Sequence, residues 1–178
     1  MHPDHHPGPA QERAVYDMHE NHVDDPDYRH FLARLADPLM RRLSGASQGL
    51  DYGCGPGPAL VAMLREAGHD MALYDPFYAP DPAALNRRYD FITCTEVAEH
   101  FHHPAIQFDR LADLLRPGGI LAVMTQFQTD DTDFATWQYR RDPTHVVFYR
   151  EATMARIAEI HSWALDIPAK DVAIFTSP

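Results

Sequence analysis

Three closely spaced glycines, Gly53, Gly55 and Gly57, constrain this chain more than any other feature of its sequence. They follow a short apolar run that begins at Leu50, and Pro58 behind them suits the first turn of a helix. The pattern predicts a strand, a tight loop and a helix. Because glycine has no Cβ and reaches positive φ freely, the backbone of such a loop can approach a ligand closely. We therefore expect a bound ligand at this loop.

The spacing of the glycines distinguishes two kinds of ligand. The loop has the pattern Gly-x-Gly-x-Gly, whereas dinucleotide-binding folds use Gly-x-Gly-x-x-Gly. An acidic residue, Asp51, also lies at the end of the expected strand. Both differences favour S-adenosylmethionine over NAD as the ligand.

Four segments occur in a characteristic order along the chain. The loop from Asp51 to Gly57 is followed by Asp75 at the end of the next apolar run, and then by segments 89–100 and 115–119. Together these segments resemble the class I S-adenosylmethionine-dependent methyltransferases over residues 50–127. The resemblance implies a three-layer, doubly wound, mostly parallel α/β sheet with an antiparallel C-terminal edge. It also implies S-adenosylmethionine as the methyl donor.

The chemistry of several residues indicates how the donor would be bound. A carboxylate at the end of the second strand, Asp75, can accept hydrogen bonds from both ribose hydroxyls. Free amides at the N-terminus of the helix after the glycines favour the carboxylate of the methionine moiety. The residues expected to bind the cofactor are Tyr16, Asp51, Gly53, Cys54, Gly55, Asp75, Pro76, Phe77, Thr95 and Glu96.

Structural roles remain open for some of these residues. Asp75 could be a turn residue before Pro76, and Phe77 could belong to the core. Tyr16, with His19 and Asn21 on the same expected helix, could contact the cofactor or form a polar surface face.

The interval between Asp75 and Tyr89 is short for this family, and only one short helix over residues 82–88 fits in it. A further parallel strand would need a crossover of at least about 10–12 residues in addition to the strand itself. We therefore predict that the sheet lacks its third strand. The acidic contact to the adenine that this unit usually supplies would then have no counterpart here.

Composition limits the possible partners and the compartment. The formal net charge of -11 opposes a hold on nucleic acid, which needs a basic face. No apolar stretch approaches the roughly 20 residues that cross a bilayer, and we expect neither a membrane segment nor a leader. The two cysteines, Cys54 and Cys94, lie in the ligand region rather than in a disulfide or zinc spacing. We expect a cytoplasmic protein with a small-molecule partner.

The chain is long enough for one domain with one core. Residues 1–10 are rich in histidine and proline and predict a disordered tail. Residues 11–178 predict a single methyltransferase domain. Its expected parts are N-terminal helices at 11–45, a cofactor-binding core at 48–127, an acceptor-site lid at 128–150, and a C-terminal helix and strands at 151–178.

Aromatic residues gather in the segment 126–150, which is too long for a plain connection and predicts the acceptor site. His145 lies there in an Asp-x-Thr-His pattern, and its ordinary pKa suits a general base. The alternative is that His145 makes hydrogen bonds within the fold and shapes the lid. Transfer to an acceptor that is already activated needs mainly alignment, which supports this alternative.

A cluster of histidines, His100, His102 and His103, raises the question of a metal site. The cluster is flanked by Phe101 and Pro104 and has no fourth ligand at a recognisable spacing. We interpret it as a structural or surface feature and predict no metal site.

The sequence thus predicts an S-adenosylmethionine-dependent methyltransferase that acts on a small-molecule acceptor by direct in-line methyl transfer. One alternative is a catalytically inactive, S-adenosylmethionine-binding regulatory module. An NAD-dependent oxidoreductase is a further alternative, which the glycine spacing disfavours. The sequence leaves the acceptor and the oligomeric state open.

Overall fold

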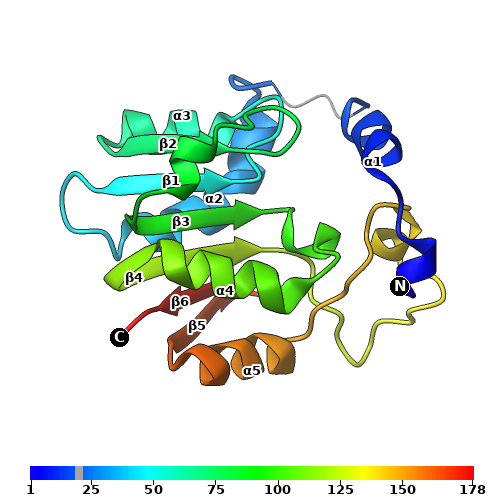
Figure 1. The fold of residues 1–178 in the computed structure, drawn as a ribbon. Coiled ribbons are helices and arrows are strands. Elements are labelled where there is room, and N and C mark those ends of the chain that lie inside the picture. Colours follow the sequence, from blue (N-terminus) through cyan, green and yellow to red (C-terminus); the bar gives the residue numbers. More distant parts are fainter. Residues whose placement is uncertain (19–21) are drawn as a thin grey trace.

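A six-stranded sheet forms the centre of the computed structural model, which describes residues 1–18 and 22–178 (Figure 1). The strands lie in the order β2-β1-β3-β4-β6-β5. Strands β1 to β4 pair in parallel, and β6 is antiparallel to both β4 and β5. The strands are β1 Gln48–Tyr52, β2 Asp70–Tyr74, β3 Tyr89–Thr95, β4 Leu115–Met124, β5 Ala164–Ala169 and β6 Val172–Thr176. The predicted doubly wound sheet with an antiparallel C-terminal edge is confirmed.

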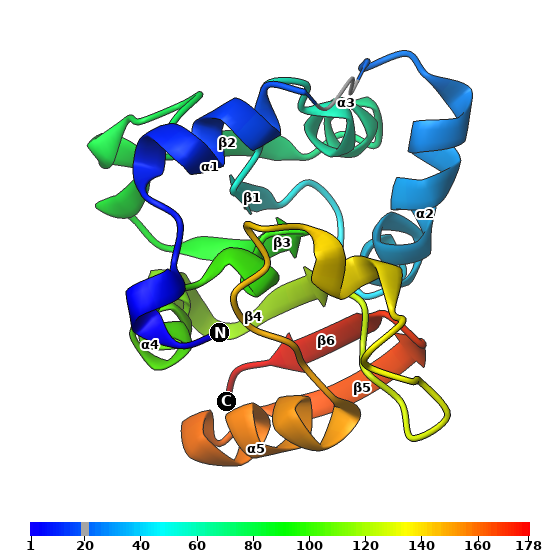
Figure 2. The ribbon, with the colours of Figure 1, turned by 90° about the vertical axis from the view of Figure 1, so that its right-hand side faces the viewer.

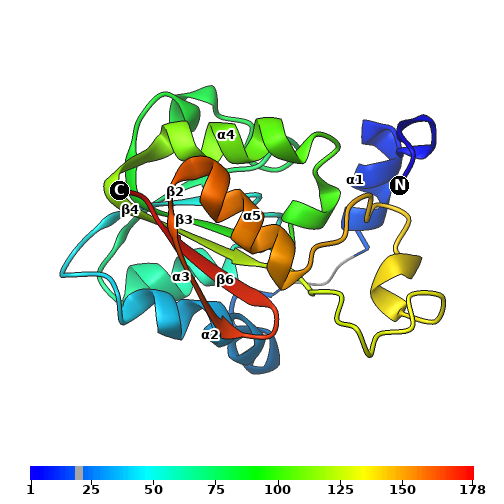
Figure 3. The same ribbon diagram turned by 90° about the horizontal axis from the view of Figure 1, so that it is seen from below.

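Helices cover both faces of the sheet, with α2 and α3 on one face and α4 and α5 on the other (Figure 3). Neighbouring residues of β3 serve opposite faces. Phe91 packs with residues of α2 and α3, and Ile92 packs with residues of α4 and α5. A strand that is buried on both faces needs such a continuous apolar run. The helices are α2 Pro26–Met40, α3 Ala59–Glu66, α4 Pro104–Leu114 and α5 Glu151–His161.

The sheet ends at β2 and lacks the third strand that the family usually adds there, as predicted. Between β2 and β3 the chain forms only the short 3-10 helix η2 (Pro82–Leu85). Asp75 and Ala79 exchange backbone hydrogen bonds of 3.0 and 3.1 Å, so the chain turns back directly after β2. The strand order reverses between β1 and β3, which is the place where doubly wound sheets bind their ligands.

The N-terminal segment lies beyond the carboxyl ends of the strands, beside the lid (Figures 1 and 2). It contains the 3-10 helix η1 (Pro3–His5) and the helix α1 (Pro9–Tyr16). This course differs from the disordered tail expected for residues 1–10. Helix α1 begins earlier than expected because proline suits the first helical turn and the Gln11 side chain accepts a 3.0 Å hydrogen bond from the Gly8 amide.

The expected lid at 128–150 has little regular structure, apart from the 3-10 helix η4 (Gln138–Arg141). It leaves the sheet after β4 and returns where Phe127 and Tyr149 form an isolated bridge. A second short 3-10 helix, η3 (Ala98–His100), follows β3 and lies under the lid. Within the described part of the chain, no helix has the length and apolar character needed to cross a membrane.

Candidate functional site

Two glycines of the loop after β1 have positive φ, +86° at Gly53 and +61° at Gly55. The amides of Gly53 and Cys54 donate to the carbonyl of Tyr74 at the end of β2, over 2.7 and 3.3 Å. A Cβ at Gly53 would lie 2.4 Å from a methyl group of Val97, whereas a Cβ at Gly55 would meet no atom within 4 Å. Gly53 is therefore required by packing. Gly55 faces open space in which a ligand can approach the backbone.

The carboxylate of Asp75 connects the glycine loop to the turn after β2. Its Oδ2 accepts a 3.1 Å hydrogen bond from the amide of Gly55, and its Oδ1 accepts from the amides of Phe77 and Tyr78 over 2.8 and 3.0 Å. Asp75 therefore has the structural role in the turn that the sequence analysis gave as an alternative to ligand binding. It is also a wall of the cavity described below. An ionised carboxylate has about four acceptor positions, so Oδ2 retains capacity for a ligand hydroxyl.

Asp51 lies beneath the loop and is not among the residues that line the cavity. Its Oδ1 accepts a 2.6 Å hydrogen bond from the hydroxyl of Thr93 on the neighbouring strand. Burial raises the pKa of Asp51 to about 6, although the hydrogen bond from Thr93 opposes the shift. The position indicates a supporting role for Asp51 rather than direct contact with a ligand.

A cavity of about 730 Å³ opens at the carboxyl ends of β1, β2 and β3. This volume is typical of a small-molecule site. Apart from Asp51, every residue expected to bind the cofactor lines the cavity, and so does His145. The sequence analysis missed Tyr28 and Phe31 of α2, whose stacked rings lie 6.2 Å apart in the wall. Their helical spacing indicated only an apolar face, because residues of a core and of a cavity wall share that pattern.

Two acidic side chains lie where β3 ends, Glu99 fully buried and Glu96 half-buried. Glu96 has a φ of +52°, which is uncommon for a residue other than glycine. The hydroxyl of Tyr139 from the lid donates to Glu99 Oε1 and lies 3.3 Å from Glu96 Oε2. Burial raises the pKa of both carboxyl groups, and the neighbouring Glu99 adds to the shift at Glu96. The site therefore holds concentrated acidic groups next to the cavity.

His145 is buried, and its ring lies 4.8 Å from the ring of His100 between ring centroids. Its Nδ1 is 2.7 Å from the carbonyl of Tyr139, and its Nε2 is 3.9 Å from Oδ2 of Asp142. The Nδ1 of His100 is likewise 2.9 Å from the carbonyl of Thr144. Both rings are thus oriented by the backbone of the lid. These contacts agree with the lid-shaping alternative.

A second cavity of about 600 Å³ opens among residues of the lid. Asp142 and His145 belong to the walls of both cavities, so the two spaces lie next to each other at these residues. The other walls come from the lid and from the residue after β4 that leads into it. They are Gln126, Thr132, Asp133, Thr136, Trp137, Gln138 and Tyr139.

Helix α1 lies beyond the carboxyl ends of the strands (Figure 2), and its Glu12 and Tyr16 line the first cavity. The ring of Tyr16 contacts the rings of Phe77 and His100 edge to face, with centroids 5.7 and 5.1 Å apart. The structure thus places Tyr16 in the cavity wall rather than on a polar surface. His19 and Asn21, which were considered with it, lie outside the described residues.

The fold and the site together define the architecture of the class I methyltransferases. A donor-sized cavity lies at the reversal of strand order, and a lid holds a second cavity against it. The family described as a methyltransferase domain matches residues 22–164, and the chain belongs to this family. The class predicted from the sequence is therefore confirmed.

One curated relative is the ubiquinone biosynthesis O-methyltransferase of Serratia proteamaculans, which is 32% identical over 80 residues. The matched stretch is 45% of this chain and 33% of that enzyme, so the match spans about a third of the curated relative's length.

Solved methyltransferase structures share the fold. A methyltransferase of Bacillus halodurans C-125 matches 74% of this chain and 70% of its own, with a TM-score of 0.54 and 19% identity. The 1,6-didemethyltoxoflavin-N1-methyltransferase of Burkholderia thailandensis matches 94% of this chain and 83% of its own, with a TM-score of 0.60 and 17% identity. The latter structure contains 1,6-didemethyltoxoflavin and S-adenosylhomocysteine. At these identities the likeness concerns the fold alone.

Proposed function

We propose that this chain transfers a methyl group from S-adenosylmethionine to a small-molecule acceptor in one in-line step. The observation that carries the proposal is the junction of the two cavities at Asp142 and His145. A donor in the cavity of about 730 Å³ would meet an acceptor in the cavity of about 600 Å³ at this point. Methyl transfer needs such a meeting of two bound molecules, because alignment supplies much of the rate.

The contacts proposed for the donor follow from the geometry of the loops. The remaining acceptor capacity of Asp75 Oδ2 suits a ribose hydroxyl. The open space at Gly55, close to the start of α3, suits the carboxylate of the methionine moiety. The edge-to-face rings of Phe77 and Tyr16 offer an apolar wall for the adenine. Pro76 and Cys54 complete this part of the wall.

The reactive end of the donor would lie near Thr95 and Glu96. The sulfonium group of S-adenosylmethionine is a cation, and nearby carboxyl groups in a water-poor site stabilise it more strongly than they would in water. Glu99, which is buried, and Glu96, which is half-buried, lie at this end. Burial raises the pKa of both carboxyl groups, and a sulfonium cation beside them would favour their charged form. Charge complementarity therefore supports placing the sulfonium at this end of the cavity.

In the proposed step a lone pair of the acceptor attacks the methyl carbon and the carbon–sulfur bond breaks. Sulfur keeps the electron pair, and S-adenosylhomocysteine is released. The acceptor proton passes to His145 if this residue is the base, or it is lost before binding if the acceptor enters deprotonated. The lid and α1 would exclude water during the transfer.

Three observations support a small acceptor. Aromatic rings of the lid pack on one another, with Phe148 5.2 Å from Phe134 and 5.5 Å from Trp137 between ring centroids. Of these three rings, Trp137 lines the second cavity. Relatives include an O-methyltransferase of ubiquinone biosynthesis and an N1-methyltransferase bound to 1,6-didemethyltoxoflavin. The net charge of -11 opposes a nucleic-acid acceptor.

We propose a cytoplasmic location and a single catalytic domain over residues 11–178.

The donor site is tested by replacing Asp75. Asp75→Asn keeps one acceptor oxygen for the Phe77 and Tyr78 amides, whereas Asp75→Ala removes all three amide contacts. We expect both variants to bind S-adenosylmethionine at least 10-fold more weakly by calorimetry, because each loses hydrogen bonds to a charged acceptor. Asp113→Ala, at an exposed position of α4, is the matched control. Unchanged affinity in a folded Asp75→Asn variant would rule out the proposed ribose contact.

Turnover separates an enzyme from a binding module. Transfer of a labelled methyl group from S-adenosylmethionine to a pool of small metabolites is expected in a single-turnover reaction. A protein that binds the donor tightly but labels nothing would instead be a regulatory module.

A further inference from the structure

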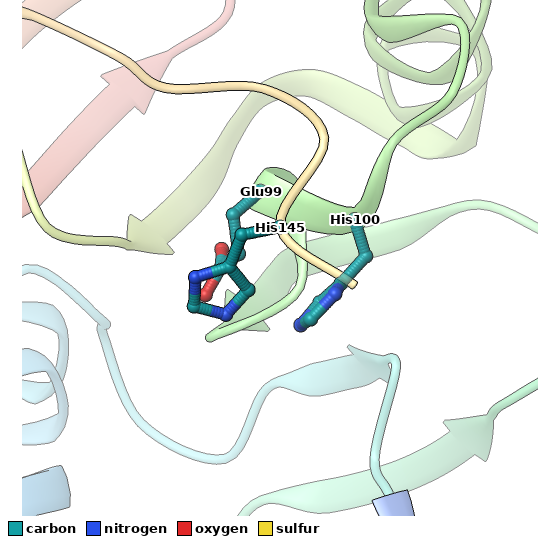
Figure 4. A group of neighbouring side chains, drawn as sticks. All are labelled: Glu99, His100 and His145. Atoms are coloured by element: carbon teal, nitrogen blue, oxygen red, sulfur yellow. The ribbon is translucent and has the colours of Figure 1, made fainter. Parts of the chain in front are cut away.

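A carboxylate and two imidazoles meet at the wall between the two cavities. Glu99 and His100 project from η3, and His145 projects from the lid (Figure 4). Their candidate ligand atoms all lie within 4.8 Å of one another. Two atoms that each lie about 2.1 Å from one cation are at most about 4.2 Å apart, so a small adjustment closes this group on an ion. We propose that Glu99, His100 and His145 bind one divalent metal cation.

The orientation of the two imidazoles suits this role. The Nδ1 atoms of His100 and His145 lie 2.9 and 2.7 Å from the carbonyls of Thr144 and Tyr139. A carbonyl only accepts hydrogen bonds, so Nδ1 carries the proton of each neutral ring and Nε2 carries the lone pair. Histidine ligands of metals are commonly held in this way by a carbonyl behind the ring.

The carboxylate supplies the second, independent observation. Glu99 is fully buried at 0% exposure, and its Oε1 accepts a hydrogen bond from the hydroxyl of Tyr139. Its Oε2 has no hydrogen-bond partner among the described residues. Burying a carboxylate oxygen without a partner is costly. A cation bound to Oε2 would remove this cost, and Tyr139 would hold the carboxylate in place from behind.

The donor set indicates the class of metal and its use. Two imidazoles and one carboxylate suit Zn²⁺, Fe²⁺, Mn²⁺ or Co²⁺ and leave positions open for other ligands. All three residues line the first cavity, where the donor is proposed to bind, and His145 also lines the second cavity, proposed for the acceptor. An acceptor hydroxyl could therefore occupy an open position, where a cation favours its deprotonated form. This use rests on the proposed methyl transfer, whereas the cation site itself does not.

The site replaces two earlier expectations. A coordinated Nε2 has no lone pair for a proton, so His145 would be a ligand rather than a general base. The sequence analysis considered His100 with His102 and His103 and predicted no metal. In the structure Nε2 of His102 instead lies 2.8 Å from the carboxylate of Glu12. The proposed ligand from the lid is distant in the sequence, so local spacing did not reveal it.

The experiment is a Co²⁺ titration of the full chain after removal of metals with a chelator and without cofactor. Replacement of His2, His5 and His6 by alanine in every sample prevents binding by the N-terminal histidines. The visible absorption of Co²⁺ then reports ligand type and stoichiometry. We expect one Co²⁺ per chain in this parent and in the control His102→Gln. Glu99→Gln and His145→Gln are expected to bind Co²⁺ about 100-fold more weakly.

Circular dichroism and thermal unfolding of the same samples show that each variant is folded, and binding of S-adenosylhomocysteine to the parent is measured beside them. If Glu99→Gln does not fold, His100→Gln takes its place with the same expectation. A parent that binds no Co²⁺ at millimolar concentration would overturn the site, as would equal Co²⁺ affinities in the parent and in His145→Gln. Failure of the parent to bind S-adenosylhomocysteine would overturn the proposed function and leave the cation result intact.

Discussion

A single buried carboxyl, Asp51, illustrates how one residue of the site can influence the whole fold. It lies beneath the glycine loop, 5% exposed, and is held by the hydroxyl of Thr93. Burial raises its pKa to about 6. The unfolded chain has a pKa of about 3.9 at this side chain, so the folded state binds more protons between pH 4 and 6. The favourable contribution of the protonated carboxyl is therefore present at low pH and is lost as pH rises through this window.

The variant Asp51→Asn should remove this pH dependence, because an amide does not titrate. The shift of about two units corresponds to at most about 3 kcal/mol in the free energy of unfolding. Urea unfolding of both proteins between pH 4 and 7 measures it. We expect the stability of the parent relative to the variant to fall by part of this amount as pH rises. A constant difference across the range would contradict the burial of an ionisable Asp51.

His145 is the residue at which the two cavities meet, and its replacement tests the reaction most locally. His145→Ala and His145→Gln should each lower turnover by about 10²- to 10⁴-fold if the residue is a base. Affinity for S-adenosylmethionine should change much less than turnover, because the contacts proposed for the donor at Gly55 and Asp75 do not involve His145. If His145 is instead a metal ligand, chelator treatment of the parent also abolishes turnover, and added Co²⁺ or Zn²⁺ restores it. Normal turnover in either variant would refute both roles.

Among the elements, α1 depends most on the site for its position. Its contacts are made by side chains whose partners line the first cavity. Glu12 lies 2.8 Å from Nε2 of His102, the Tyr16 ring contacts Phe77 and His100, and Asp17, directly after the helix, accepts a 2.6 Å hydrogen bond from the hydroxyl of Tyr78. A helix of this length is marginal in water by itself. We therefore expect α1 to open and close over the bound donor.

The variant Tyr16→Ala should weaken this cover, and Tyr16→Phe should preserve it, because the ring rather than the hydroxyl contacts Phe77 and His100. Stopped-flow measurement of S-adenosylhomocysteine release is expected to show faster dissociation only in Tyr16→Ala, by about 10-fold if the ring pairs contribute about 1.4 kcal/mol. Equal release rates in both variants would mean that α1 is not a cover.

The elements also show what a sequence can predict. Phe91 and Ile92 lie in a short apolar run between turn signals, so β3 could be located from local pattern alone. The absence of the third strand could be predicted because too few residues lie between Asp75 and Tyr89 in the sequence. The cluster of Glu99, His100 and His145 did not follow, because it depends on how the irregular lid returns over η3. Likewise, Tyr28 contributes to the cavity only through the placement of α2.

At the scale of the whole molecule, the sheet and the irregular segments divide the work. The two apolar layers on the sheet make a rigid support, and the reversal of strand order leaves the glycine loop and Asp75 side by side. The N-terminal segment and the lid, from opposite parts of the chain, close the space above that edge (Figures 1 and 2). Loops that differ in sequence on a shared sheet scaffold allow one fold to bind many different acceptors.

The most direct test is a crystal structure of the protein grown with S-adenosylhomocysteine. We expect the nucleoside in the cavity of about 730 Å³, with a ribose hydroxyl on the Asp75 carboxylate and the sulfur turned toward His145. A complex in which the product lies elsewhere, or in which side chains fill this cavity at saturating product, would contradict the proposed donor site.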